Sequence, residues 1–109
     1  MADDSFHDYV KELFAGLGPI QIKRMFGGLG IYAHGTIIAI ETDSEIFLKA
    51  DAQSAELFAA DGARQWRYDG KGKPVYMPYW SIPEDAFDDP DVMAKWVRLA
   101  LEAGLRAKK

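Results

Sequence analysis

The chain has 109 residues, of which 49% are hydrophobic and 28% are charged, a balance typical of one folded domain and not of a disordered segment. It contains no cysteine, which excludes disulfides, thiolate metal sites and cysteine nucleophiles. The formal net charge of −4 provides no overall attraction to nucleic acid or anionic lipid, and no apolar run is long enough to span a bilayer. Because the acidic start of the chain also lacks the features of a signal peptide, we expect a single cytoplasmic domain over residues 1–109.

The first residues predict an amphipathic helix. Ser5, followed three positions later by Asp8, resembles a capping box at the start of a helix. Gly16 and the Gly18-Pro19 pair are expected to end it, because glycine releases the backbone and proline cannot continue a helix. The apolar residues that recur at helical spacing between these signals are Phe6, Tyr9, Val10, Leu13 and Phe14.

Residues 20–50 change from helical spacing to short strands separated by turns, and we expect three antiparallel strands. The first includes residues 24–32, Arg-Met-Phe-Gly-Gly-Leu-Gly-Ile-Tyr. Because glycine has no side chain to pack in a strand, Gly28 and Gly30 predict a kink, with the change of direction at Gly28-Leu29-Gly30. Phe26 is expected to pack in the core beside this bend. His34-Gly35 is typical of a tight turn that joins residues 29–33 to the next strand, residues 36–41.

The second half of the chain predicts a helix, a hairpin and a final helix. Asp51 is the expected cap of a helix over residues 52–60. Two strands follow over residues 65–69 and 75–80, joined by the loop at residues 70–74, Gly-Lys-Gly-Lys-Pro. Pro78 predicts that the later strand lies at a sheet edge or ends early, because proline cannot donate a ladder hydrogen bond.

The final helix has the clearest sequence signals in the chain. Asp89 is a suitable cap and Pro90 suits the first helical position. Met93, Trp96, Val97, Ala100 and Leu101 form its apolar stripe. The resulting order, α-βββ-α-ββ-α, predicts an α+β fold, a two-layer α/β sandwich in which helices cover one face of an antiparallel sheet.

Two glycine-rich motifs resemble nucleotide-binding sequences but lack the required context. Residues 28–33 match G-x-G-x-x-A, yet a β-branched strand follows in place of the helix whose N-terminus would bind a pyrophosphate. The loop at residues 70–74 lacks the Ser or Thr that follows the lysine of a phosphate-binding loop. We therefore expect no cofactor.

The hairpin loop remains a candidate binding surface. Lys71 and Lys73 follow Arg64 and Arg67 of the preceding strand. The strand after them carries the aromatic residues Tyr76, Tyr79 and Trp80. Basic groups interleaved with aromatic residues can bind single-stranded nucleic acid or an acidic partner. A solvated turn beside core aromatic residues is the simpler interpretation, because the whole chain is acidic.

No constellation of residues predicts catalysis or metal binding. The five carboxylates within residues 84–91 lack the ligand order and central glycine of a calcium loop, and they suit the N-terminus of the final helix. His7 and His34 have no neighbour that would make either a convincing base. We therefore expect no catalytic residue, no metal site and no enzymatic activity.

Three segments resemble the N-terminal domain of the TfoX/Sxy family, the bacterial regulators of competence genes. They are residues 24–32, residues 47–51, and residues 68–74 with 77–80, in that order. The resemblance implies a two-layer α/β domain like that of secretion chaperones, and regulation of DNA-uptake genes through other regulators. Full-length members carry a second, helical domain, which these 109 residues do not include, and the resemblance supplies no catalytic residues.

We predict a non-enzymatic protein-interaction domain that co-regulates transcription through a partner protein, such as a transcription regulator. One alternative is direct nucleic-acid binding through the basic hairpin. Another is a pocket under the glycine bend that binds a small anionic ligand or carries out catalysis. The third is a homodimer formed by an edge strand. The candidate partner- or ligand-binding residues are Arg24, Lys49, Lys71, Lys73, Tyr79 and Trp80. The residues expected to be architectural are Phe26, Gly27, Gly28, Gly30, Asp51, Gly70 and Pro74.

Overall fold

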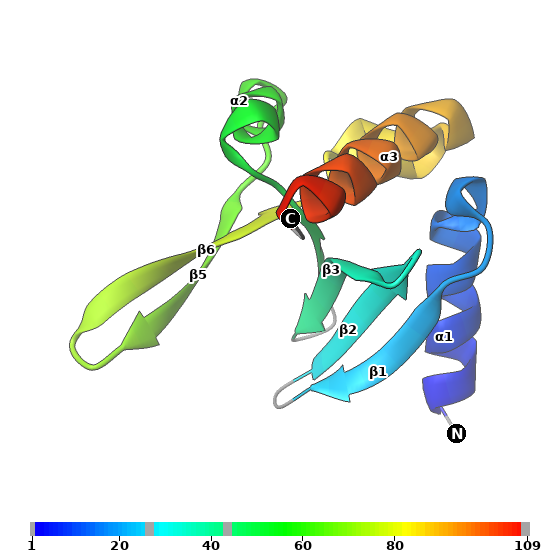
Figure 1. Ribbon diagram of the computed structural model, residues 1–109, viewed down its shortest axis with the longest axis horizontal. Helices are drawn as coiled ribbons and strands as arrows, with labels where there is room; N and C mark the ends of the chain where they lie inside the picture. Colours follow the sequence, from blue (N-terminus) through cyan, green and yellow to red (C-terminus); the bar gives the residue numbers. More distant parts are fainter. Residues whose placement is uncertain (1, 26–27, 43–44, 108–109) are drawn as a thin grey trace.

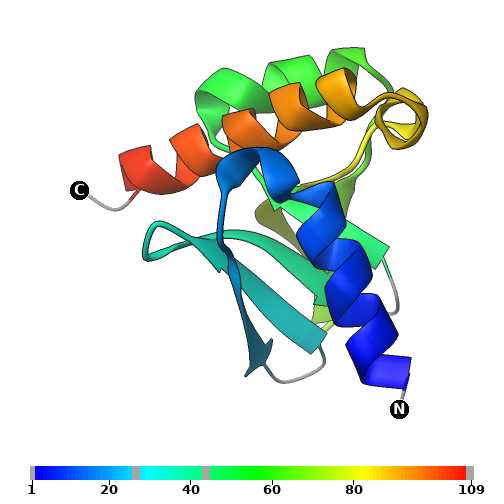
Figure 2. The ribbon, with the colours of Figure 1, turned by 90° about the vertical axis from the view of Figure 1, so that its right-hand side faces the viewer.

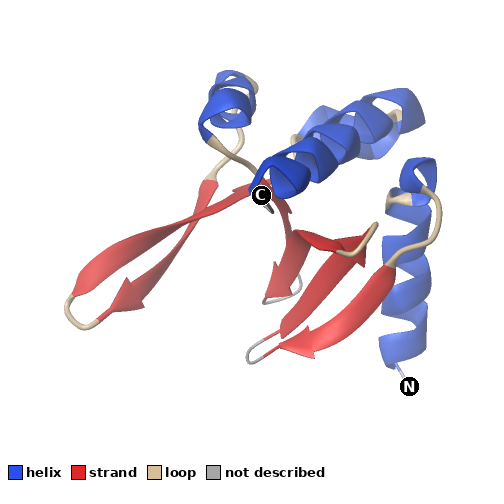
Figure 3. Ribbon diagram, in the orientation of Figure 1, coloured by secondary structure: helices blue, strands red, loops and turns tan. Residues whose placement is uncertain are grey.

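The computed structural model describes residues 2–25, 28–42 and 45–107. Over these residues the strands form one six-stranded antiparallel sheet with the order β1-β2-β3-β4-β6-β5, and the helices pack on one face of it (Figures 1 and 3). The predicted α+β class is therefore confirmed. The helices are α1 (Ala2–Leu13), η1 (Ala15–Leu17), α2 (Ala52–Ala60), η2 (Glu84–Asp88) and α3 (Pro90–Ala107), where η denotes a 3₁₀ helix. The strands are β1 (Gln21–Met25), β2 (Gly28–Ala33), β3 (Thr36–Thr42), β4 (Glu45–Lys49), β5 (Gln65–Gly70) and β6 (Lys73–Ser81).

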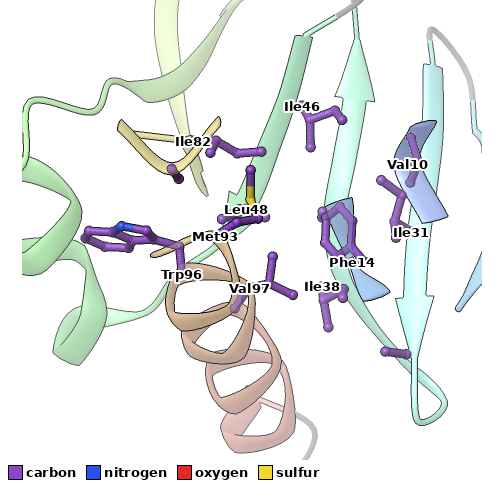
Figure 4. Packing of buried hydrophobic residues seen from close by; sticks show 14 of the residues in the cluster. Val10, Phe14, Ile31, Ile38, Ile46, Leu48, Ile82, Met93, Trp96 and Val97 are labelled. Carbon is purple, nitrogen blue, oxygen red and sulfur yellow. The ribbon is translucent and has the colours of Figure 1, made fainter. Parts of the chain in front are cut away.

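The main hydrophobic core lies between the sheet and the helices (Figure 4). Ile38 of β3 and Leu48 of β4 are fully buried in it, and Val10 of α1 packs from the opposite layer. Helices α2 and α3 lie side by side (Figure 2), and the rings of Phe58 and Trp96 join them at a centroid distance of 4.7 Å. All residues of the predicted apolar stripe of α3 contribute to this core, so the predicted stripe is confirmed. None of the described helices is long and apolar enough to cross a membrane.

The glycine-rich stretch forms two strands, where one kinked strand was expected. Strands β1 and β2 pair antiparallel, with Met25 opposite Gly28. The chain therefore reverses before Gly28, and the predicted change of direction at Gly28-Leu29-Gly30 is wrong. Phe26 and Gly27 lie outside the described residues, so the prediction that Phe26 packs in the core stays a prediction.

Close pairing of β2 with β3 explains why Gly28 belongs to a strand. A Cβ atom added at Gly28 would lie only 1.8 Å from the backbone oxygen of Glu41. Glycine is thus required here by the approach of a neighbouring strand, and not by a turn. The same local signal, glycine in an apolar stretch, is compatible with either role, so the sequence pattern alone did not separate them.

The predicted starts of α2 and α3 are confirmed, whereas the predicted start of α1 is wrong. Asp51 Oδ1 accepts a hydrogen bond from the Ser54 backbone N–H at 3.1 Å, and Ser54 Oγ accepts one from the Asp51 N–H, which completes a capping box. Asp89 Oδ1 accepts from the N–H two residues later at 3.0 Å. Helix α1 begins three residues before Ser5, since the two aspartates ahead of Ser5 also suit a first helical turn.

Pro78 lies inside β6, which is an internal strand between β4 and β5, so the predicted edge position is wrong. The pairing of β6 with β4 begins only at Tyr79, and the β5–β6 ladder has an irregularity between Gln65 and Arg67. The Pro78 carbonyl accepts a hydrogen bond from the Ala50 N–H at 3.0 Å. Proline is tolerated because neither neighbouring ladder needs an N–H from this position.

Residues 67–76, here called the arm, form the far part of the β5–β6 hairpin and project away from the helices and from β1 to β3 (Figures 1 and 3). Gly72 at its turn has a φ of 81°, a backbone conformation that suits glycine. The predicted turn at His34-Gly35 is confirmed, with φ angles of 52° and 77° that are typical of a two-residue type I′ hairpin.

Candidate functional site

The face of the sheet opposite the helices carries a second apolar cluster. Successive side chains of a strand point to opposite faces, so Leu48 enters the main core whereas Phe47 and Lys49 lie on the other side. The cluster contains no residue from the described helices. We call this surface the uncovered face, and its residues are Lys23, Met25, Tyr32, Ile37, Ile40, Phe47, Lys49, Trp66, Met77 and Tyr79.

The centre of the uncovered face is buried, although no described helix covers it. Ile40, Phe47 and Tyr79 are between 4% and 8% exposed, although they come from three successive strands of one sheet. The Trp66 ring of β5 lies beside Phe47, with centroids 6.2 Å apart and planes inclined by 41°. Met77 of β6 packs against the same cluster. These contacts join the body of the sheet to the base of the arm.

Two lysines lie over tyrosine rings on this face. The Lys49 Nζ is 5.1 Å from the centroid of the Tyr79 ring, and the Lys23 Nζ is 4.8 Å from that of Tyr32. Lys49 and Tyr79 are direct cross-strand partners on β4 and β6. Neither lysine forms an ion pair with any residue in the described part of the chain.

Tyr79 is a neutral, desolvated group at neutral pH. Burial raises the pKa of its phenol above the usual value, and the nearby Tyr32 raises it further because two tyrosinates would repel each other.

Charge is segregated between the two layers. The helices contain ten acidic and four basic residues, whereas the strands contain five basic and three acidic ones. Of the acidic residues on the strands, Glu45 is already paired with Arg64. The sheet layer is thus the more basic part of an acidic protein, a local arrangement that the net charge of −4 conceals.

The structure brings together two of the six predicted binding residues, Lys49 and Tyr79. Arg24 lies on the edge strand β1 and, by strand alternation, on the side of Ile22, which packs against the main core. Trp80 also belongs to the helix side, where its ring stacks on Phe58 at 6.4 Å. The remaining two, Lys71 and Lys73, are exposed at the tip of the arm.

Among the predicted architectural residues, Asp51 has the most extensive contacts. In addition to capping α2, it accepts two hydrogen bonds from Arg106 of α3, at 2.5 and 3.0 Å. The hydrogen bond from Arg106 lowers the Asp51 pKa to about 2. Hydrogen bonds from Ser54 lower it as well, and partial desolvation opposes both effects. Gly70 and Pro74 occupy the end of the β5–β6 ladder, where Gly70 pairs with Lys73.

Lys23, Tyr32 and Phe47 are site residues that sequence reasoning missed. Each lies at an alternating position of a strand, and that period could have placed Phe47 with Lys49 on one face. The cross-strand neighbours could not be found in this way, because they depend on the strand order.

Gly104 was also missed by the sequence analysis. A Cβ atom added there would be 2.9 Å from the Ile37 backbone oxygen, so the glycine permits close packing of α3 on β3.

The helix side has a separate groove of about 420 Å³ near Leu13, Phe87 and Met93, away from the glycine-rich strand. Within the described ranges, no group of three or more His, Asp or Glu side chains is arranged to hold a metal ion. The chemistry available on the uncovered face is therefore apolar contact combined with attraction of anions by two lysines.

The chain is similar to known proteins over most of its length. The family described as TfoX N-terminal domain matches residues 12–104. Protein Sxy of Escherichia coli (strain K12) is 26% identical over 98 residues, which cover 90% of this chain and 47% of that protein. The chain thus spans about half the length of this relative. Because the family match extends from α1 to the last turns of α3, the chain belongs to the TfoX N-terminal domain family.

Proposed function

We propose that this chain is a non-enzymatic interaction domain that regulates transcription by binding a partner protein through the uncovered face and the arm. Membership of the TfoX N-terminal domain family supports a regulatory role, because the resemblance to TfoX/Sxy proteins implies control of competence genes. The observation that carries the proposal is the second apolar cluster, which lies on a sheet face without a described helix over it.

The composition of this surface also supports a protein partner. Tyrosine, tryptophan, phenylalanine and methionine are enriched in protein interfaces, and the uncovered face contains all four types. The arm adds Tyr76, a large side chain that is 61% exposed. Large exposed aromatic residues are frequent anchors of such interfaces.

Affinity purification of the tagged chain from its native host, with and without nuclease, tests the proposal. We expect a nuclease-resistant protein partner, and we expect Tyr76→Ala to reduce its recovery about tenfold or more. Phe87→Ala is the matched control, because Phe87 is an aromatic residue that is 49% exposed on η2, at the helix side. Recovery of no partner, or equal losses with both variants, would contradict the proposal.

Direct nucleic-acid binding through the arm is the second candidate. Arg67, Lys71 and Lys73 are exposed and have no ion pair among the described residues. Phosphate binding by these side chains predicts an affinity for a labelled oligonucleotide that falls steeply with salt, because counterions are released. Absence of binding at low salt would eliminate this candidate.

A further inference from the structure

We propose that the uncovered face binds an acidic, extended segment of the partner, with its carboxylates on Lys23 and Lys49 and an apolar side chain on Ile37, a partly buried residue that packs against the cluster. This inference rests on the proposed function and deepens it by naming the chemistry of the partner.

Charge complementarity selects an acidic occupant. Lys23 and Lys49 are the basic residues of the uncovered face, and neither is neutralised by a described side chain. The one acidic residue of β4, Glu45, is occupied by Arg64. An acidic segment would be repelled by the helix layer, with ten acidic and four basic residues, and attracted to the sheet layer. Such complementarity selects both the partner and the face on which it binds.

The strand spacing sets the pattern of the segment. Lys23 lies on β1 opposite Gly30 of β2, which is opposite Ile40 of β3 and then Phe47 of β4. Three strand spacings of about 4.8 Å separate β1 from β4, and Lys49 lies two residues beyond Phe47 along β4, so roughly 16 Å separate the two lysine backbones. Four residues of an extended chain cover about 13 Å and leave both end residues on the same side, and the long lysine side chains can close the remaining gap. The expected pattern is acidic, any, apolar, any, acidic.

The ring geometry favours carboxylates over nucleic acid on this face. Base stacking needs open aromatic faces. Here one face of Tyr79 is covered by Lys49, one face of Tyr32 by Lys23, and Phe47 is only 4% exposed. A carboxylate instead gains from a cation that is already held in place, since less side-chain freedom is lost on binding.

Fluorescence anisotropy with the full chain tests this inference. The probe is a labelled synthetic peptide with two glutamates four positions apart and a phenylalanine midway between them. We expect Lys23→Glu and Lys49→Glu each to weaken binding about fivefold or more. Lys95→Glu is the matched control, because the Lys95 Nζ also lies over an aromatic ring, 5.2 Å from the Trp96 centroid, but on α3. It should change the affinity less than twofold, roughly the effect of a distant rim charge.

Several outcomes would overturn the inference. One is that Lys95→Glu weakens peptide binding as much as Lys23→Glu and Lys49→Glu do. Another is that a peptide with lysine in place of glutamate binds as tightly as the acidic peptide. The third is that a thymidine oligonucleotide binds more tightly than the acidic peptide and that Lys49→Glu abolishes its binding. Lys49→Gln serves as a second variant that removes the charge without reversing it, and a retained unfolding transition shows that each variant is folded. If Lys23→Glu and Lys49→Glu still recover the native partner, this inference fails while the proposed function stands. If no variant and no wild-type chain recovers a partner, the proposed function fails instead.

Discussion

Asp51 connects two helices that are far apart in the sequence. Its carboxylate caps α2 and accepts both hydrogen bonds of Arg106 near the end of α3. A capping box is visible in the sequence because its partners are three residues apart. The ion pair spans 55 positions and was not predictable, since it depends on how α3 returns across the sheet.

Asp51→Ala should lower the free energy of unfolding by about 1–2 kcal/mol at neutral pH, mainly through the lost cap. The folded-state pKa of Asp51 is depressed to about 2 from an ordinary value of 3.8, so its stabilisation is present above about pH 4 and disappears as the pH falls through 2. Urea unfolding at pH 7 and near pH 2 measures this, and the difference between wild type and variant should shrink at the lower pH. Asp88→Ala, at an exposed carboxylate of η2, is the control; an equal effect would contradict the assignment.

Gly28 and Gly30 differ sharply in what a side chain would meet. At Gly28 an added Cβ collides with the Glu41 backbone oxygen at 1.8 Å, so the strands themselves must separate. At Gly30 the nearest atom, at 2.7 Å, is the Met25 sulfur, the flexible end of a side chain that can move. Gly28→Ala should therefore cost about 3 kcal/mol or more and Gly30→Ala about 1 kcal/mol. Chemical denaturation of both variants measures their free energies of unfolding. Equal losses of stability would show that β2 and β3 pair differently.

Tyr79 should make the fold sensitive to alkaline pH. Its pKa is raised in the folded state by burial and by Tyr32, so the folded state prefers the protonated phenol. The resulting stabilisation is complete below the ordinary tyrosine pKa of about 10 and is lost as the pH rises beyond it. Tyr79→Phe should reduce the fall in thermal stability between pH 9 and about 11, whereas Tyr76→Phe, at an exposed ring, should not. Identical pH profiles for all three proteins would refute this assignment.

At the scale of elements, local signals determined the helices better than the strands. The bounds of α2 and the cap of α3 follow from Asp51, Asp89 and Pro90, which act within one helical turn. For the β1–β2 hairpin the sequence predicts one kinked strand instead, because glycine serves equally in a bend and in close strand pairing. Pro78 was misplaced for a related reason: its effect depends on which neighbouring residues need a ladder hydrogen bond.

The arm should be the least protected part of the sheet. Its described side chains at the far end, including Lys73 and Tyr76, are exposed, whereas β3 contributes Ile38, Ala39 and Ile40 to buried clusters. Amides in residues 67–76 should therefore exchange with deuterium at least about tenfold faster than those of β3. Hydrogen exchange with mass spectrometry measures this. Protection of the arm that rises with protein concentration would instead support the homodimer, which remains a prediction.

At the scale of the whole molecule, one acidic protein has two layers of different charge and a sheet with two apolar faces. The helices bury one face, and the other is left with aromatic residues, two lysines and the arm. A net charge of −4 argues against nucleic acid as the main partner, while the distribution of charge favours an acidic protein segment on the sheet. The composition supplied the first argument, and only the fold supplied the second.

By itself, the sequence determined the α+β class, the helix starts at Asp51 and Asp89, the His34-Gly35 turn and the family, because each depends on residues close together in the chain or on motifs read in order. The tertiary structure alone decided that Lys49 meets Tyr79 and that Trp80 faces the helices. The physical reason is the order β4-β6-β5, in which the chain leaves β4, forms α2, and returns so that β6 pairs beside it. Contacts made by that return join residues some 30 positions apart, as in Lys49 and Tyr79, and no local pattern encodes them.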